Sequence, residues 1–329
     1  MTIPLPPSGG GAVSPESAPG TPGGATGAPD TTAEDRGVSL WRGAFRRLRR
    51  NPTAILGAVI VLAFIAVAVL APLLTSYEPG AAQDAGEITP SSVPGPSPDH
   101  WLGLDSFGSD LWTQLVYGAR QSLVYGVIST AIGLVVGAAL GALAGGFGAV
   151  GGRAGQWVDT AVMRIVDLWL SIPSLLLAVS VAAILTQSAY AVMIAIGAAQ
   201  VPIFARLLRG SMLAQGRSDY VLAAGALGLR KRRIVMSHVL PNSIGPTIVQ
   251  ATLNLATAII EVAALSYLGL GTADPAVAEW GRMLVAAQDR FDESPQLAIY
   301  PGVAIAITAL GFTLFGEALR EALDPRSRR

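Results

Sequence analysis

Residues 121–152 read QSLVYGVISTAIGLVVGAALGALAGGFGAVGG, a stretch without any charged residue between Arg120 and Arg153. A helix needs about 20 predominantly apolar residues to cross the hydrocarbon core of a bilayer. This stretch exceeds that length. It therefore predicts a membrane-spanning helix near residues 122–147.

The same criterion finds further apolar stretches on both sides of this one. The stretch at 168–205 is too long for one span, and the polar residues Thr186, Gln187 and Ser188 divide it into two. Another stretch is interrupted only by Glu261. The remaining predicted spans are residues 52–74, 243–270 and 298–316. We therefore predict an all-α polytopic membrane protein with about six transmembrane helices.

The composition supports a protein that is solvated mainly by lipid. Hydrophobic residues make up 51% of the chain and charged residues only 13%, whereas a soluble domain carries about 25% charged residues. The net charge is zero, which gives no reason to expect nucleic-acid binding. The chain has no cysteine, and its two histidines, His100 and His238, lie far apart. We expect no disulfide and no metal site.

The basic residues indicate how the chain is inserted. Cytoplasmic segments of membrane proteins carry an excess of Lys and Arg. If the N-terminus is cytoplasmic, all Lys and Arg residues lie on the cytoplasmic side except Arg120, Arg282 and Arg290. We therefore expect both termini in the cytoplasm.

The chain divides into a leader, an elbow and a membrane part. Residues 1–36 are rich in Gly, Pro, Ala, Ser and Thr, which predicts a disordered cytoplasmic leader. Residues 37–51 contain the basic sequence WRGAFRRLRR, which favours an amphipathic elbow at the inner leaflet over a solvated run of charges. Residues 52–117 hold the first span and an extracytoplasmic segment. Residues 118–325 form the core, in which 271–297 is expected to lie at the outer surface.

The longest cytoplasmic loop, residues 210–242, carries the strongest functional signal. The pattern predicts a short helix from Asp219 to Leu227, which Gly228 can end in the left-handed conformation. A second short helix then leads to Pro241, which can open the next span. A helix this short is not stable alone in water. Its apolar residues therefore imply a partner surface.

This loop resembles the EAA loop of bacterial ABC-importer permeases, in which Glu-Ala-Ala is followed by three residues, Gly, and later Leu-Pro. The wider chain, over about residues 42–326, is similar to the dipeptide/oligopeptide/nickel permease family, the C-type subunit in particular. Besides the loop, the resemblance rests on the sequences HWLG at 100–103, DSFG at 105–108, YGARQSL at 117–123, MRIVD at 163–167, SIPS at 171–174, EVAALSYLGLG at 261–271, EWG at 279–281 and LREALDP at 319–325.

The resemblance implies a type I ABC-importer permease fold and several partners. These are a second, B-type permease, two ATPase subunits that bind ATP and Mg²⁺, an extracytoplasmic substrate-binding protein, and membrane lipid. It further implies a location in the bacterial plasma (inner) membrane and a cargo of dipeptides or oligopeptides, with nickel, haem or glutathione as alternatives. No cofactor is expected in this chain.

Site residues follow from the resemblance by position. The residues expected to couple to the ATPases are Tyr220, Leu222, Ala223, Ala224, Gly228, Leu240 and Pro241, and those expected to dock the binding protein are Trp101, Asp105, Glu279 and Trp280. Leu222 stands where the family has its glutamate, and Ser109 stands where the family often has arginine. For Ala223, Ala224 and Gly228 the alternative is ordinary small-residue packing.

Other functions fit the sequence less well. The chain has no Walker phosphate loop, and its only lysine is Lys231, so it is not expected to hydrolyse ATP. A stand-alone secondary transporter or channel would need ionisable residues near the bilayer midplane, and the predicted spans have almost none. An intramembrane protease would need a nucleophile with a base, or a metal set, at membrane depth. The predicted spans hold no such set.

Several polar and small residues keep two interpretations. Gln200, Gln250 and Asn254 are candidates to line the pore or to bond one helix to another. Arg164 and Asp167 are spaced for an ion pair within one helix. The run from Arg230 to Arg233 enforces topology or contacts an ATPase. The glycines at 126, 133, 137, 141 and 145 permit close packing, within this chain or against a partner.

Overall fold

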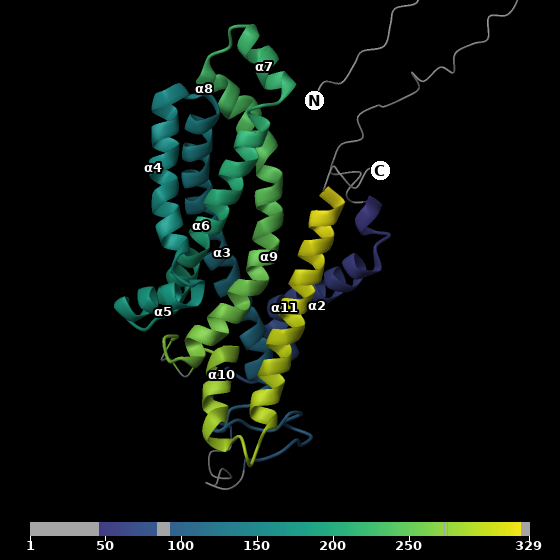
Figure 1. Cartoon of the computed structure of the whole chain (residues 1–329). Coiled ribbons are helices and arrows are strands. Elements are labelled where there is room, and N and C mark those ends of the chain that lie inside the picture. The colour runs from purple at the N-terminus through teal and green to yellow at the C-terminus, as the bar shows by residue number, and fades with distance from the viewer. Residues whose placement is uncertain (1–45, 84–92, 273, 275, 324–329) are drawn as a thin grey trace, which may run out of the picture. The chain divides into compact units, whose positions relative to one another are not determined.

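The computed structural model describes residues 46–83, 93–272, 274 and 276–323 (Figure 1). The predicted leader at 1–36, most of the elbow at 37–51 and residues 324–325 lie outside these ranges. Where the elbow enters the described part, residues 46–48 are helical. Arg47 donates a hydrogen bond to the carbonyl of Ala322 over 3.4 Å, so the start of the first long helix lies beside the end of the last.

Helices make up the regular structure of the described residues, and β-pairing there is limited to isolated bridges. In chain order the helices are α2 (Pro52–Leu74), α3 (Leu111–Val150), α4 (Gly152–Leu170), α5 (Ser174–Ile184), α6 (Ala189–Gln215), α7 (Asp219–Ala226), α8 (Lys231–Ile234), the π-helix η2 (Val235–Val239), α9 (Leu240–Tyr267), α10 (Trp280–Ala287), the 3₁₀-helix η3 (Gln288–Arg290) and α11 (Gln296–Leu323).

The long helices confirm the number of predicted spans and correct the boundaries of two of them. Five helices in the described part are long and apolar enough to cross a membrane, and six if α4 and α5 count as one bent span. The helix predicted near 122–147 starts earlier, because the carboxylate of Asp110 accepts the backbone N–H of Thr113 at 2.8 Å and caps α3 before Leu111.

The third predicted span, starting at residue 168, is wrong in its boundaries. Its helix begins at Gly152, and α4 and α5 meet at an angle of 88°. Pro173 stands at this break, where proline has no backbone N–H to continue the helix. The predicted division at residues 186–188 is confirmed, since α5 ends at Ile184 and α6 begins at Ala189.

A stripe of glycines joins α3 to α6. A Cβ atom added at Gly137 would lie 2.5 Å from the carbonyl oxygen of Val201, and one at Gly141 would lie 2.5 Å from that of Ala205. Gly133 and Gly145 approach α6 in the same way. Packing within this chain therefore explains the four-residue spacing.

At the end of the molecule opposite α7, aromatic side chains pack between several helices. Phe64 of α2 packs against Trp280 of α10 and Phe312 of α11, with ring centroids 5.7 and 6.0 Å apart. The indole N–H of Trp280 donates to the carbonyl of Leu115 over 2.9 Å. These contacts tie α2, α3, α10 and α11 together at the end of the molecule opposite α7 (Figure 1).

Candidate coupling hairpin and permease site

The short helix α7 ends in a Schellman motif, in which Gly228 has the left-handed conformation that the sequence predicts. Gly228 has a φ of +78°. The N–H of Leu229 bonds to the carbonyl of Ala224 over 3.2 Å, and the N–H of Gly228 bonds to that of Gly225 over 3.0 Å. These two bonds satisfy carbonyls at the helix end, so the backbone itself fixes the turn between α7 and α8.

One face of this hairpin is packed on the long helices. Val221 and Ile234 are buried together with Leu208 and Met212 of α6. Ala224 and Leu229 are partly buried in the same cluster. The hairpin is therefore anchored to α6 rather than free to move alone.

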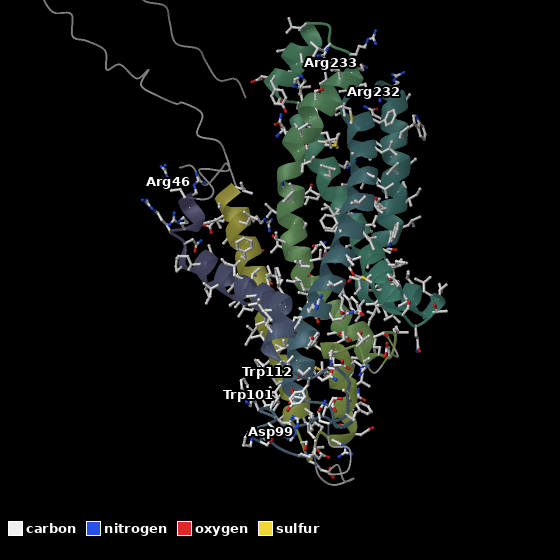
Figure 2. All side chains as sticks on the ribbon, turned by 180° about the vertical axis from the view of Figure 1, so that it is seen from behind. Arg46, Asp99, Trp101, Trp112, Arg232 and Arg233 are labelled. Atoms are coloured by element: carbon white, nitrogen blue, oxygen red, sulfur yellow. The ribbon has the colours of Figure 1, made fainter. Side chains whose placement is uncertain are left out.

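The opposite face of α7 is apolar and open. Leu222 is 63% exposed and Leu227 is 80% exposed. Ala223 and Gly228 are exposed beside them. The basic residues from Arg230 to Arg233 are also exposed, and Figure 2 shows Arg232 and Arg233 at this end of the molecule. A helix with one anchored face and one exposed apolar face is suited to bind another protein.

The remaining predicted coupling residues support the hairpin. The hydroxyl of Tyr220 donates to Gln215 Oε1 over 2.8 Å and accepts from Asn242 Nδ2 over 3.3 Å, which links the end of α6 to the start of α9. Leu240 is partly buried in the hairpin cluster. Pro241 stands in the first turn of α9, as predicted.

The three predicted pore-lining residues form one hydrogen-bonded group. Asn254 of α9 exchanges hydrogen bonds of 3.4 Å with Gln200 of α6, and Gln250 Nε2 donates to Asn254 Oδ1 over 2.9 Å. Gln200 and Asn254 are buried, while Gln250 is half-buried. The geometry supports the helix–helix bonding alternative, and lining of the pore stays a prediction.

The outer loop before α3 is built around Asp105. Its carboxylate accepts the N–H groups of Phe107 and Ser109, each over 2.8 Å. The hydroxyl of Ser106 bonds to the carbonyl of Ala286 in α10 over 3.1 Å. Trp101 is 67% exposed and points outward in Figure 2. Of the four predicted docking residues, Trp101 offers the most surface.

Two of the predicted docking residues are buried, which corrects their expected role. Glu279 is 1% exposed and Trp280 is 2% exposed. The carboxylate of Glu279 caps α10 by accepting the N–H groups of Gly281 and Arg282 over 2.9 and 3.2 Å. These side chains hold the outer segment in place and offer no surface for direct contact.

Comparison with known families identifies the chain. Residues 137–329 match the family described as the binding-protein-dependent transport system inner membrane component, and residues 39–90 match the N-terminal TM domain of oligopeptide transport permease C. The chain belongs to the binding-protein-dependent permease family.

Three named transport permeases are similar in sequence to this chain. The permease is 41% identical to the dipeptide transport system permease protein DppC of Alkalihalophilus pseudofirmus, over 88% of this chain and 91% of that one. It is 36% identical to the probable D,D-dipeptide transport system permease protein DdpC of Escherichia coli K12, over 85% and 90%. It is 38% identical to the glutathione transport system permease protein GsiD of Salmonella typhimurium, over 87% and 90%.

A solved structure supports the fold. The permease resembles a chain of the inward-facing MetNI methionine ABC transporter with a TM-score of 0.52 and 20% sequence identity, covering 64% of this chain and 96% of that one. At this identity the likeness concerns the fold alone. Together with the family match it confirms the predicted all-α ABC-importer permease architecture.

Ion pairs between α4 and α6 were missed from the sequence. Asp167 pairs with Arg206 over 2.6 Å, so the expected pair of Asp167 with Arg164 is wrong. Asp159 pairs with Arg209, with contacts of 2.5 and 2.7 Å. Spacing gave no signal for these pairs, since the two aspartates stand eight residues apart on α4 while the two arginines stand three apart on α6. Their pairing depends on how α4 lies beside α6.

Glu261, the one charged residue in the apolar stretch of α9, has a hydrogen-bond partner on another helix. Its Oε1 accepts a hydrogen bond from Ser174 Oγ over 3.2 Å. This contact joins α9 to the first residue of α5, next to the break after α4.

The burial of Glu279 predicts a pH dependence of stability. Burial raises the pKa of its carboxyl above 4.5, the ordinary value. The folded permease then holds this proton more tightly than the unfolded chain, so the stabilisation is full below the unfolded pKa and declines as pH rises. Relative to Glu279→Gln, which cannot ionise, the wild-type unfolding temperature should rise as pH falls from neutrality toward 4.5. Parallel thermal unfolding curves of both proteins at all pH values would contradict this expectation.

Proposed function

We propose that this permease is the C-type membrane subunit of a bacterial ATP-driven importer of short peptides. The observation that carries the proposal is the anchored hairpin with its exposed apolar face at Leu222, Ala223 and Leu227. The family match and the names of the similar permeases support the peptide cargo. Glutathione, nickel and haem are the alternative cargoes, and of these glutathione is favoured because a relative carries that name.

The proposal assigns energy and substrate delivery to other chains. Two ATPase subunits, which bind ATP and Mg²⁺, would receive the exposed face of α7. A second, B-type permease would complete the pathway. A binding protein outside the membrane would deliver peptide to the outer segments, where Trp101 is exposed. In this assembly the permease is a non-catalytic subunit.

Rigid-body motion would transmit the work of the ATPases. The Schellman bonds fix the turn after α7, and Val221 and Ile234 hold the hairpin on α6. A force on Leu222 and Leu227 therefore moves α6 and α9 together with the hairpin. ATP-driven closure of the ATPases would in this way switch the pathway between outward-facing and inward-facing states.

The proposed orientation places the hairpin in the cytoplasm of the bacterial inner membrane. With six spans, counting α4 and α5 as one, the start of α2, the hairpin and the end of α11 fall on the same side. The basic residues near Arg47, Arg232 and Arg320 gather on this side, as cytoplasmic segments do. Both termini are then cytoplasmic.

Transport by the reconstituted importer tests the cargo. Proteoliposomes that hold both permeases and both ATPases should accumulate a labelled dipeptide when ATP is enclosed and loaded binding protein is added. Excess unlabelled dipeptide should compete, and glutathione should compete less. Uptake of nickel, haem or glutathione without uptake of any dipeptide would reject the peptide assignment.

Cross-linking tests the coupling face. The chain has no cysteine, so a single Leu227→Cys substitution introduces a unique thiol. We expect a short bifunctional reagent to join it to an ATPase subunit in the assembled importer. Trp101→Cys, at a position that is also exposed but lies at the opposite end, is the matched control and should not cross-link to the ATPase. Failure of Leu227→Cys to react, or equal reaction of both variants, would remove α7 from this role.

A further inference from the structure

We propose that a charged cavity formed by Arg164, Asp167 and Arg206 lines the translocation pathway, and that Arg164 binds the carboxylate of a peptide in transit. The inference rests on the proposed function, because it concerns how this permease contacts its cargo. It rests on the contact between α4 and α6, called the seam below, where the two ion pairs between these helices lie.

The seam holds two ion pairs with different surroundings. Asp159 and Arg209 lie at the covered end, where their side chains are 11% and 29% exposed. Asp167 and Arg206 lie at the open end, where their side chains are 49% and 55% exposed. Both pairs join α4 to α6. The pair of Asp159 and Arg209 is largely covered, whereas the pair of Asp167 and Arg206 presents its charges on the surface of this chain.

A cavity of about 270 Å³ opens along this seam. Its lining consists of Thr160, Met163, Arg164, Asp167, Arg206 and Arg209. Sites that enclose a whole drug-sized ligand measure about 300–1,000 Å³. The cavity is thus suited to receive one end of a short peptide rather than the whole molecule.

The charges around the cavity favour an anionic ligand. Arg206 and Arg209 are each paired with an aspartate, whereas Arg164 takes part in no ion pair within the described residues. Arg164 is an exposed residue and contributes to the lining of the cavity. Its fork of N–H groups matches the two oxygens of a carboxylate.

The position of the charges argues for a wet pathway. Arg164 lies 12 residues after the start of α4 at Gly152, and Arg206 lies nine residues before the end of α6 at Gln215. At 1.5 Å per residue both stand about 14–18 Å from the hairpin end of these helices. Both α4 and α6 belong to predicted spans, and charged residues within a span face a bundle interior or a water-filled cavity rather than lipid.

One exposed face of α4 is polar, next to an exposed apolar face with Trp157, Ile165 and Leu168. Gln156, Thr160, Arg164 and Asp167 follow each other at helical spacing and are all exposed in this chain. The helix therefore presents a continuous polar stripe to whatever lies beside it. A stripe of this kind suits a hydrated path along which a zwitterionic peptide moves.

Transport by Arg164→Gln tests the proposal. Turnover should be measured in the reconstituted importer at saturating, preloaded binding protein, so that recognition by the binding protein does not limit the rate. Removal of one charge-assisted hydrogen bond should lower turnover of a dipeptide about tenfold or more. Arg164→Lys should restore part of the rate. Arg153→Gln, near the start of α4 and outside the cavity, is the control and should transport normally.

A peptide amide distinguishes carboxylate binding from a structural effect. Arg164→Gln should change turnover of the amidated dipeptide much less than that of the free acid. Equal losses for both substrates, or no loss for either, would overturn the assignment of Arg164. If wild-type importer carries no peptide at all, the proposed function itself fails, which is a separate result.

Chemical accessibility tests the cavity without relying on transport. Thr160→Cys places a unique thiol in the cavity lining. A charged, water-soluble thiol reagent should modify it in the assembled importer, and dipeptide should slow the reaction. Val135→Cys, an exposed position on the apolar surface of α3, should stay unmodified. Lack of reaction at Thr160→Cys would show that the seam is covered by the partner permease or by lipid, and would overturn the proposal.

Discussion

Gly137→Leu should leave almost no folded permease after extraction into detergent. An added Cβ atom would already lie 2.5 Å from the carbonyl oxygen of Val201 and 2.7 Å from the Cβ of Phe204. Both neighbours are buried in α6, so neither can move away from leucine. Overpacking of a core costs about 1–3 kcal/mol where side chains can yield, and more where they cannot. Here the added atoms meet backbone, so α3 and α6 must separate, and we expect a cost comparable to the roughly 5–15 kcal/mol that stabilises a typical protein.

Gly210→Leu is the matched control for this substitution. Gly210 also lies in a long helix, α6, but no atom lies within 4 Å of its added Cβ. Leucine favours a helix over glycine by somewhat less than about 1 kcal/mol. We expect size-exclusion chromatography after heating to recover Gly210→Leu like the wild type, and to recover Gly137→Leu hardly at all. Equal recovery would show that α3 and α6 do not pack closely at this stripe.

Alanine variants of Gly137 and Gly210 should show a smaller effect on stability at the same two positions. Gly137→Ala adds the single methyl group that meets the backbone of Val201. Its unfolding temperature should fall below that of the wild type, whereas Gly210→Ala should be neutral or more stable.

Local signals account for the parts of the fold that the sequence predicts well. The absence of charge over 121–152 is sufficient to predict a spanning helix, because the cost of charges in lipid acts on each residue separately. Likewise the left-handed turn at Gly228 depends on the glycine itself and on bonds within a few residues. Such features do not require knowledge of neighbouring helices.

Features that depend on distant parts of the chain were not predictable in the same way. Asp159 and Asp167 make α4 too polar to be recognised as part of a span, and their partners, Arg209 and Arg206, lie on another helix. From the sequence, Glu279 and Trp280 are expected at the surface, because the segment around them is polar. Trp280 is buried because residues of α2, α3 and α11 converge on it, and Glu279 is buried where the start of α10 packs beside Ser266 of α9.

Gly228→Val should abolish uptake of peptide while the permease still inserts into the membrane. The φ of +78° at this position is rarely adopted by residues with a Cβ atom and is least suited to β-branched ones. Strain of this kind costs about 1–3 kcal/mol. The valine would favour loss of the Schellman turn, and α7, only eight residues long, would lose the capping that fixes its exposed face.

Gly228→Asn separates backbone conformation from side-chain bulk. Asparagine is larger than alanine but tolerates the left-handed conformation, and no atom lies within 4 Å of a Cβ added here. We expect Gly228→Asn to keep much of the ATP-dependent uptake, Gly228→Ala to lose part of it, and Gly228→Val to lose nearly all of it. Blots of membrane fractions should show similar amounts of each variant.

The order of these three variants decides what the hairpin contributes. If valine and asparagine impair uptake equally, bulk against the partner matters and the turn conformation does not. If Gly228→Val transports like the wild type, the capped hairpin carries no force, and the coupling role assigned to α7 is wrong. A graded loss that follows the cost of the left-handed conformation is the result expected if rigidity of this turn transmits motion from the ATPases to α6 and α9.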